Sequence, residues 1–100
     1  FLDGHVSCVF GTHTHVQTAD EKILSEGTAF ISDLGMVGAY DSIIGMKKEE
    51  IVQKFVDQLP ARFEPPESGT CLFSAVVVDV DVKTGSAQHI KRILKQFNIA

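Results

Sequence analysis

Residues 71–82 carry the pattern that most restricts how this chain can fold. The segment starts as a continuous apolar run and becomes a strict alternation of apolar and acidic residues from Val78 to Val82. Such alternation is typical of a strand with one buried and one solvated face. Asp79 and Asp81 share the polar face, and we interpret them as solvated side chains rather than as a catalytic pair. The segment therefore predicts a long strand.

A second long strand is predicted after a tight turn at residues 83–86, Lys-Thr-Gly-Ser. The next segment, 87–97, is ambiguous, because several of its apolar residues also recur at the period of a helix. Those residues are Ile90, Ile93, Leu94 and Phe97. The turn favours a hairpin, so we predict a strand through about residue 93.

The remaining elements are shorter. Strands are predicted at residues 5–10 and 28–32, which are rich in β-branched and aromatic side chains. Residues 21–26 could form a short strand or a loop. Residues 47–59 have one apolar face at steps of three and four, and Pro60 ends the pattern, which predicts a surface helix.

A pair of histidines directly follows the first predicted strand. Gly11 ends the strand, and His13 and His15 come next with one residue between them. Residues two apart in an extended segment point to the same side, so the two imidazoles could bind one metal ion or two adjacent ions. The other interpretation is two ordinary polar histidines in a loop. We favour metal binding because a buried strand and a glycine precede the pair.

Several polar residues could support such a site. Thr12 and Thr14 flank the histidines and can donate hydrogen bonds, and Gln17 and Thr18 could contact a phosphate oxygen or orient a histidine. Metal-bound histidines usually give their second N–H to a carbonyl or carboxylate group, and Asp33 is a candidate acceptor. Asp20 is a second candidate, but an exposed turn residue is the stronger interpretation of it.

The overall charge excludes one class of function. The chain has 100 residues, with 9 basic and 13 acidic side chains and a net charge of −4. The basic residues do not form the positive face that nonspecific nucleic-acid binding requires. No apolar run reaches the length of a membrane span. Two cysteines form no disulfide framework, which fits a cytoplasmic protein.

Three segments carry a resemblance to a known family. Residues 11–20, GTHTHVQTAD, resemble the last motif of the calcineurin-like metallophosphoesterases, in which Gly-His-x-His is the usual form. Residues 28–38, TAFISDLGMVG, and residues 40–46, YDSIIGM, are similar to a bacterial subgroup, the YmdB-type phosphodiesterases. The resemblance extends over nearly the whole chain.

The resemblance implies a fold, a position in a longer protein and an activity. It implies an α/β fold, with residues 1–100 as the C-terminal part of one αββα sandwich domain that contains a mixed sheet, one main helix and a C-terminal hairpin. It also implies that His13 binds one and His15 the other of two divalent metals, iron or manganese, with zinc as a third candidate. The other ligands would come from earlier in the full protein, and this segment alone would be inactive.

The implied activity is hydrolysis of phosphodiesters, including cyclic nucleotides. We expect the protein to be a homo-oligomer without a membrane partner. No catalytic residue beyond the metal ligands is expected in this segment. Two alternatives stay open: a metal-dependent amidohydrolase, which also carries His-x-His after a strand, and a non-catalytic module with ordinary histidines. The amidohydrolase motif should be followed by repeated strand–helix units, whereas this chain predicts one helix and a hairpin.

Overall fold

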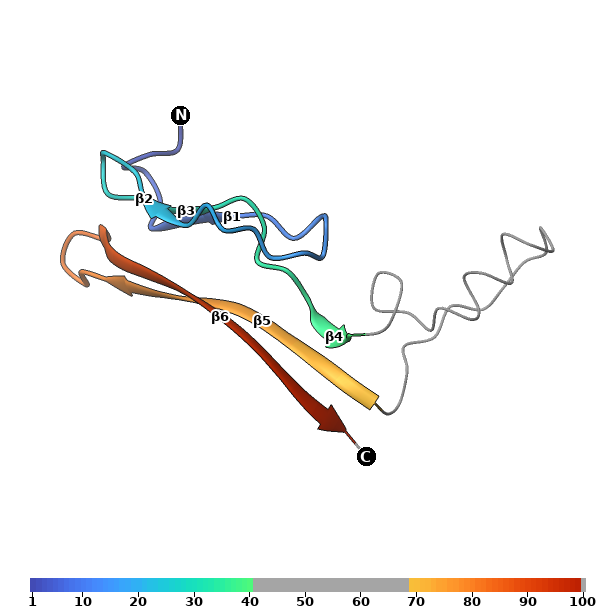
Figure 1. The fold of residues 1–100 in the computed structure, drawn as a ribbon. Coiled ribbons are helices and arrows are strands. Elements are labelled where there is room, and N and C mark those ends of the chain that lie inside the picture. The colour runs from blue at the N-terminus through green and yellow to red at the C-terminus, as the bar shows by residue number, and fades with distance from the viewer. Residues whose placement is uncertain (41–68, 100) are drawn as a thin grey trace, which may run out of the picture. The chain divides into compact units, whose positions relative to one another are not determined.

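The computed structural model of the chain describes residues 1–40 and 69–99. They form six strands in two sheets (Figure 1). The strands are β1 (Cys8–Phe10), β2 (Lys22–Ile23), β3 (Ala29–Ile31), β4 (Val37–Ala39), β5 (Gly69–Val80) and β6 (Ala87–Ile99). The chain divides into two compact units, one with Phe1–Met36 and Ser74–Leu94, the other with Val37–Phe73 and Lys95–Ala100.

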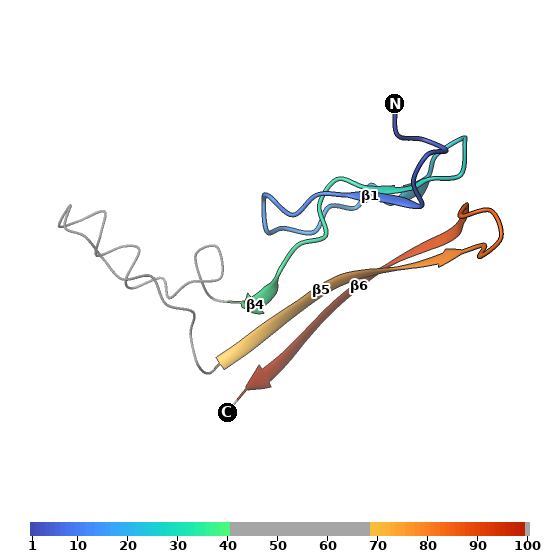
Figure 2. The same ribbon diagram turned by 180° about the vertical axis from the view of Figure 1, so that it is seen from behind.

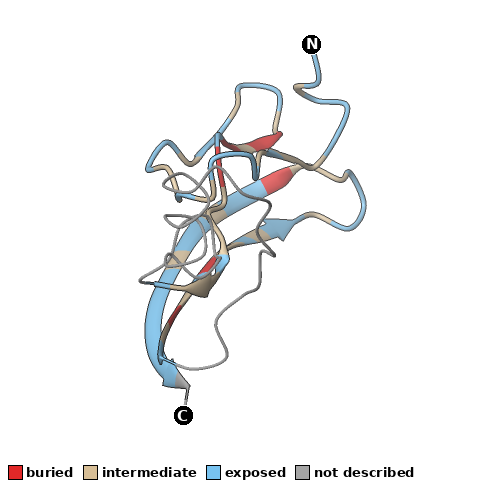
Figure 3. Cartoon of the chain, turned by 90° about the vertical axis from the view of Figure 1, so that its right-hand side faces the viewer, coloured by how far each residue is buried: buried red, intermediate tan, exposed pale blue. Residues whose placement is uncertain are grey.

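The first sheet belongs to the first unit and has the order β1-β3-β2. β1 pairs in parallel with β3, with Cys8 opposite Ala29 and Phe10 opposite Ile31. β2 pairs with the other edge of β3 in the antiparallel sense. β3 is therefore the central strand, and its Ala29 and Ile31 side chains are fully buried. The core of this sheet is small, and buried segments are few in the described chain (Figure 3).

Hydrogen bonds fasten the N-terminal turn to the start of β3. The buried hydroxyl of Thr28 donates to the carbonyl of Val6 at 2.6 Å and accepts the amide of Gly4 at 2.8 Å. The Asp3 carboxylate accepts the amides of Glu26 at 2.9 Å and Thr28 at 3.3 Å. A buried hydroxyl is tolerated only when its hydrogen bonds are made, so Thr28 fixes the path of the chain into β1.

The second sheet has the order β4-β5-β6. β4 pairs with β5 in the antiparallel sense, with Val37 opposite Phe73. β5 and β6 form the long hairpin, which Figure 2 shows from behind. Its turn is closed by the amide of Gly85, which donates to the carbonyl of Asp81 at 2.7 Å. Gly85 has a φ of 77°, which glycine adopts without strain.

The predicted hairpin is observed, and the ambiguous segment is a strand. β6 runs from Ala87 through Ile99, because pairing with β5 satisfies its backbone and outweighs the helical spacing of a few apolar side chains. Residues 22–23 form the short strand β2, so the segment left open between strand and loop contains both.

The predicted α/β class is wrong for the described structure. Residues 1–40 and 69–99 contain strands and turns but no helix, and they form two small sheets rather than a sandwich with a main helix. The apolar residues here occur in short runs or alternations between turns, and both patterns favour strands. The helix predicted at residues 47–59 lies outside the described residues. Within the described ranges, no helix could span a membrane.

Gly11 allows the close approach of two loops, and this generates a prediction. A Cβ atom at Gly11 would overlap the carbonyl oxygen of Ser32. Gly11→Ala should therefore lower the free energy of unfolding by roughly 1–3 kcal/mol, the usual cost of overpacking. Urea denaturation measures this change. Thr12→Ala, at the exposed neighbouring position, is the control and should stay close to the parent; equal effects of the two variants would contradict the steric argument.

Candidate metal-binding loop

The two histidines lie in a loop at the carboxyl end of β1. Because β1 and β3 are parallel neighbours, the loop after each strand leaves from the same edge of the sheet. The amide of Leu34 donates to the carbonyl of Gly11 at 2.9 Å, and the amide of Thr18 donates to the carbonyl of Asp33 at 3.1 Å. These bonds hold residues 11–18 against residues 32–36.

Asp33 is the buried charged group of this region, with 3% of its surface exposed. One carboxylate oxygen, Oδ2, accepts the amide of Thr14 at 2.8 Å and its hydroxyl at 2.7 Å. The other, Oδ1, accepts the amide of Gly35 at 2.8 Å. The bond from Gly35, followed by the hydroxyl of Thr14, lowers the pKa of Asp33 although burial acts in the opposite direction. The group is therefore a carboxylate at neutral pH.

His15 has an unusual backbone conformation. Its φ is 64°, in the left-handed region that residues other than glycine seldom occupy. The hydroxyl of Thr14 accepts the amide of Val16 at 3.2 Å, so a side-chain bond spans His15 from the residue before it to the residue after it. Strained backbone of this kind persists where the surroundings hold it, and it is enriched at functional sites.

The side chains of the two histidines differ in their surroundings. His13 is exposed, whereas His15 is half-buried and its Nδ1 atom is buried with no hydrogen-bond partner among the described residues. A buried nitrogen without a partner is costly, and neutral imidazole is a good ligand for divalent transition metals. The Nδ1 atom of His15 therefore fits a metal ligand. In residues 1–40 and 69–99 no group of three or more His, Cys, Asp or Glu residues could hold a metal, so further ligands would be needed.

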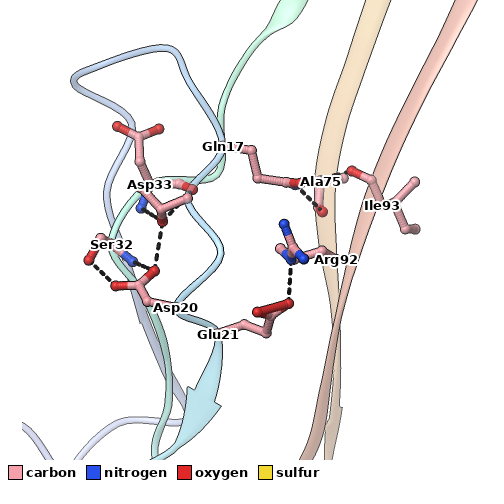
Figure 4. Close-up of polar contacts among 9 residues, drawn as sticks. Gln17, Asp20, Glu21, Ser32, Asp33, Ala75, Arg92 and Ile93 are labelled. Carbon is pink, nitrogen blue, oxygen red and sulfur yellow. Dashed lines mark hydrogen bonds and ion pairs between the residues drawn. The ribbon is translucent and has the colours of Figure 1, made fainter.

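Gln17 connects the loop to the hairpin rather than pointing to a ligand. Its amide nitrogen donates to the carbonyls of Ala75 and Ile93, each at 3.1 Å (Figure 4). One lies on β5 and the other on β6, so a single side chain binds both strands. Two carbonyl acceptors at this position require the nitrogen of the amide, which fixes its orientation. No pattern in the sequence indicated this role.

Asp20 organises the other side of the loop. Its Oδ1 accepts the hydroxyl of Thr18 at 2.7 Å and the amide of Ser32 at 3.0 Å, and its Oδ2 accepts the hydroxyl of Ser32 (Figure 4). The hydroxyl of Ser32, then that of Thr18, lowers the pKa of Asp20 to about 2. Asp20 is exposed, as an ordinary turn residue would be, but it also ties the two loops together.

The structure thus separates the predicted candidates. It brings Thr14, Thr18 and Asp33 into one hydrogen-bond network, uses Gln17 as a link to the hairpin, and leaves Thr12 exposed. Ser32 was missed, although its position at the end of a predicted strand and beside Asp33 was a usable signal. The ion pair of Glu21 with Arg92 of β6 was also missed (Figure 4), because sequence alone does not place residues 71 positions apart in contact.

Comparison with known proteins identifies relatives of this chain. A family model described as YmdB-like protein matches residues 1–93. A 2',3'-cyclic-nucleotide 2'-phosphodiesterase from Bacillus subtilis (strain 168) is 53% identical over 94 residues, which cover 94% of this chain and 35% of the relative. The chain therefore spans roughly a third of the length of this relative.

Two solved structures are similar to the fold described above. A hypothetical protein from Thermus thermophilus matches with a TM-score of 0.82 and 36% identity, over 95% of this chain and 36% of that one. A novel phosphatase from Mycoplasma pneumoniae matches with a TM-score of 0.78 and 34% identity, over 95% of this chain and 34% of that one.

The link made by Gln17 generates a prediction. Gln17→Glu keeps the size of the side chain but places a carboxylate against two carbonyl oxygens. The free energy of unfolding at pH 7 should fall by roughly 1–3 kcal/mol, because the two acceptors lose their donor. Gln88→Glu, an exposed glutamine on β6, is the matched control. If urea denaturation gives the same value for both variants, Gln17 does not fasten the loop to the hairpin.

The lowered pKa of Asp20 predicts how the stability of the fold depends on pH. The pKa of Asp20 is lowered in the folded protein. Asp20 therefore contributes fully to the free energy of unfolding above pH values of about 4, the ordinary pKa of aspartate, and this contribution is lost as the pH falls through about 2. Unfolding midpoints measured at several pH values should fall over that interval in the parent, and less steeply in Asp20→Asn. A parent and variant with identical pH profiles would show that Asp20 is not stabilised by these bonds.

Proposed function

This chain belongs to the YmdB-like protein family, and we propose that it forms part of a metal-dependent phosphodiesterase acting on small phosphodiesters such as cyclic nucleotides. The Bacillus subtilis relative is named a 2',3'-cyclic-nucleotide 2'-phosphodiesterase, and the similar Mycoplasma protein is titled a phosphatase. Both names describe phosphoester hydrolysis. Family membership also favours this function over an amidohydrolase or a non-catalytic module.

The observation that carries the proposal is the buried, unpartnered Nδ1 of His15 in a loop that also holds His13. We propose that His13 binds one and His15 the other of two divalent metals, iron or manganese, with zinc as a third candidate. Imidazole nitrogen suits each of these ions. The position of the loop at the carboxyl end of a parallel strand is where α/β-type sheets bind ligands.

The segment would supply only part of the centre. Carboxylate and amide ligands would complete it, and we propose that an aspartate, a bridging glutamate, an asparagine and another histidine come from the rest of a longer protein. Residues 1–100 would then be the C-terminal part of one metallophosphoesterase domain and would have no activity alone. The fraction of the relatives that this chain covers is consistent with such a part.

The residues of this chain have distinct parts in the proposed reaction. Two adjacent metals would supply stabilisation of the negative charge on the phosphate and activation of water at neutral pH. His13 and His15 would hold these metals. Thr12 is exposed next to His13 and can donate its hydroxyl to a phosphate oxygen. The hydroxyl of Thr18 instead donates to Asp20 and accepts the amide of Asp33, which assigns it to the loop.

We further propose a homo-oligomer located in the cytoplasm. The exposed apolar side chains of Val37 and Tyr40, 63% and 57% accessible, would suit a contact between subunits. The rest of the glycine-rich segment at residues 33–45, from residue 41 onward, lies outside the described residues. Two free cysteines, Cys8 and Cys71, are compatible with a reducing compartment.

Metal analysis tests the proposed function. The full-length protein should contain about two divalent metals per chain and hydrolyse bis-p-nitrophenyl phosphate. Changing His13 and His15 together to alanine should remove metal and activity while the protein stays folded. Changing the exposed His5 and His89 to alanine is the matched control and should alter neither. A parent without metal, or a double variant that keeps metal and activity, would refute the assignment.

A further inference from the structure

Thr14, the residue between the two histidines, is held by a single buried carboxylate. Asp33 Oδ2 accepts both its amide, at 2.8 Å, and its hydroxyl, at 2.7 Å. The carboxylate cannot turn freely, because Oδ1 is occupied by the amide of Gly35 at 2.8 Å and the group is buried. Asp33 is therefore a rigid anchor for the centre of the His-x-His segment.

The hydrogen bonds of Asp33 also restrain the backbone of His15, through Thr14. A hydroxyl has one proton, and the shorter contact assigns it to Asp33, which leaves its lone pairs for the amide of Val16 at 3.2 Å. The bonds thus run from Asp33 through Thr14 to Val16 and enclose His15, whose φ is 64°. This conformation costs free energy for a residue with a side chain, so it needs such support.

We propose that Asp33, acting through Thr14, is a positioning residue that fixes the directions in which His13 and His15 present their imidazoles to metal. The two histidines are joined to Thr14 by its two peptide bonds, so a restraint on Thr14 limits the backbone of both. The inference rests on the proposed function. It differs from the expected role of Asp33, because the carboxylate acts on the residue between the ligands and not on an imidazole N–H.

A purely structural role for Asp33 would give a different result from a positioning role. If Asp33 only stabilises the loop, its loss should lower the unfolding midpoint without changing affinity for metal in the folded protein. If it positions the histidines, affinity should fall even when the fold is intact. Thr14 is exposed, so removing its hydroxyl tests the connection without disturbing the core.

The experiment uses four variants of the full-length protein. Thr14→Val removes the hydroxyl at constant shape, Thr14→Ser restores it, and Asp33→Asn leaves one of the two oxygens. Asp3→Asn is the matched control, because Asp3 also uses both oxygens to hold a loop, at the start of β3 rather than at its end. Mn²⁺ affinity is measured by competition with a chelator, and the unfolding midpoint is measured on the metal-free protein.

We expect Mn²⁺ affinity to fall by about 10–100-fold in Thr14→Val and Asp33→Asn, the usual effect of losing support around a metal ligand. Thr14→Ser and Asp3→Asn should bind like the parent. Unchanged affinity in Thr14→Val and Asp33→Asn would overturn the positioning role and leave the proposed function intact. Equal weakening by Asp3→Asn would also overturn it. A parent that binds no Mn²⁺, iron or zinc would overturn the proposed function and the positioning role together.

Discussion

The parallel pairing of β1 with β3 is the constraint on which the candidate site depends. It directs both chain exits to one edge of the sheet, so that Gly11 and Ser32 begin neighbouring loops. The two loops are separated in sequence by β2, a turn and β3, and without this pairing Asp33 would not meet Thr14. Gly11 is required at the point of closest approach, because any side chain there would enter the opposite loop.

Hydrogen bonds, more than apolar contacts, shape the described part of the chain around this edge. The buried side chains of Thr28 and Asp33 each make several hydrogen bonds, and the buried apolar side chains are mostly small, with Ile31 the largest. Networks of this kind define one arrangement sharply, because each member left without a partner carries a large cost. They suit a site whose ligands must be held in fixed directions, although they contribute little hydrophobic stabilisation.

The sequence predicted local features well and long-range connections poorly. The continuous apolar run from residue 71 predicted β5, and Asp33, which was expected near the histidines, contacts Thr14 between them. The link from Gln17 to two carbonyls 58 and 76 positions away could not be predicted, because it depends on how the hairpin lies against the loop in the first unit. The α/β prediction was wrong for the described residues. It applied one predicted helical segment and a family resemblance to the whole chain, whereas the described residues form strands, of which β1–β4 are only two or three residues long.

The left-handed backbone of His15 has a consequence for the sequences that can occupy this position. Under the proposed metal-binding role, a replacement for His15 must both bind metal and tolerate a positive φ. Asparagine, aspartate and glycine would satisfy the backbone, whereas valine, isoleucine and threonine would not. In a saturation library, position 15 should therefore accept a narrow and unusual set of residues, including some without an imidazole. At position 13, tolerance of a substitution should depend only on whether the new side chain can bind metal.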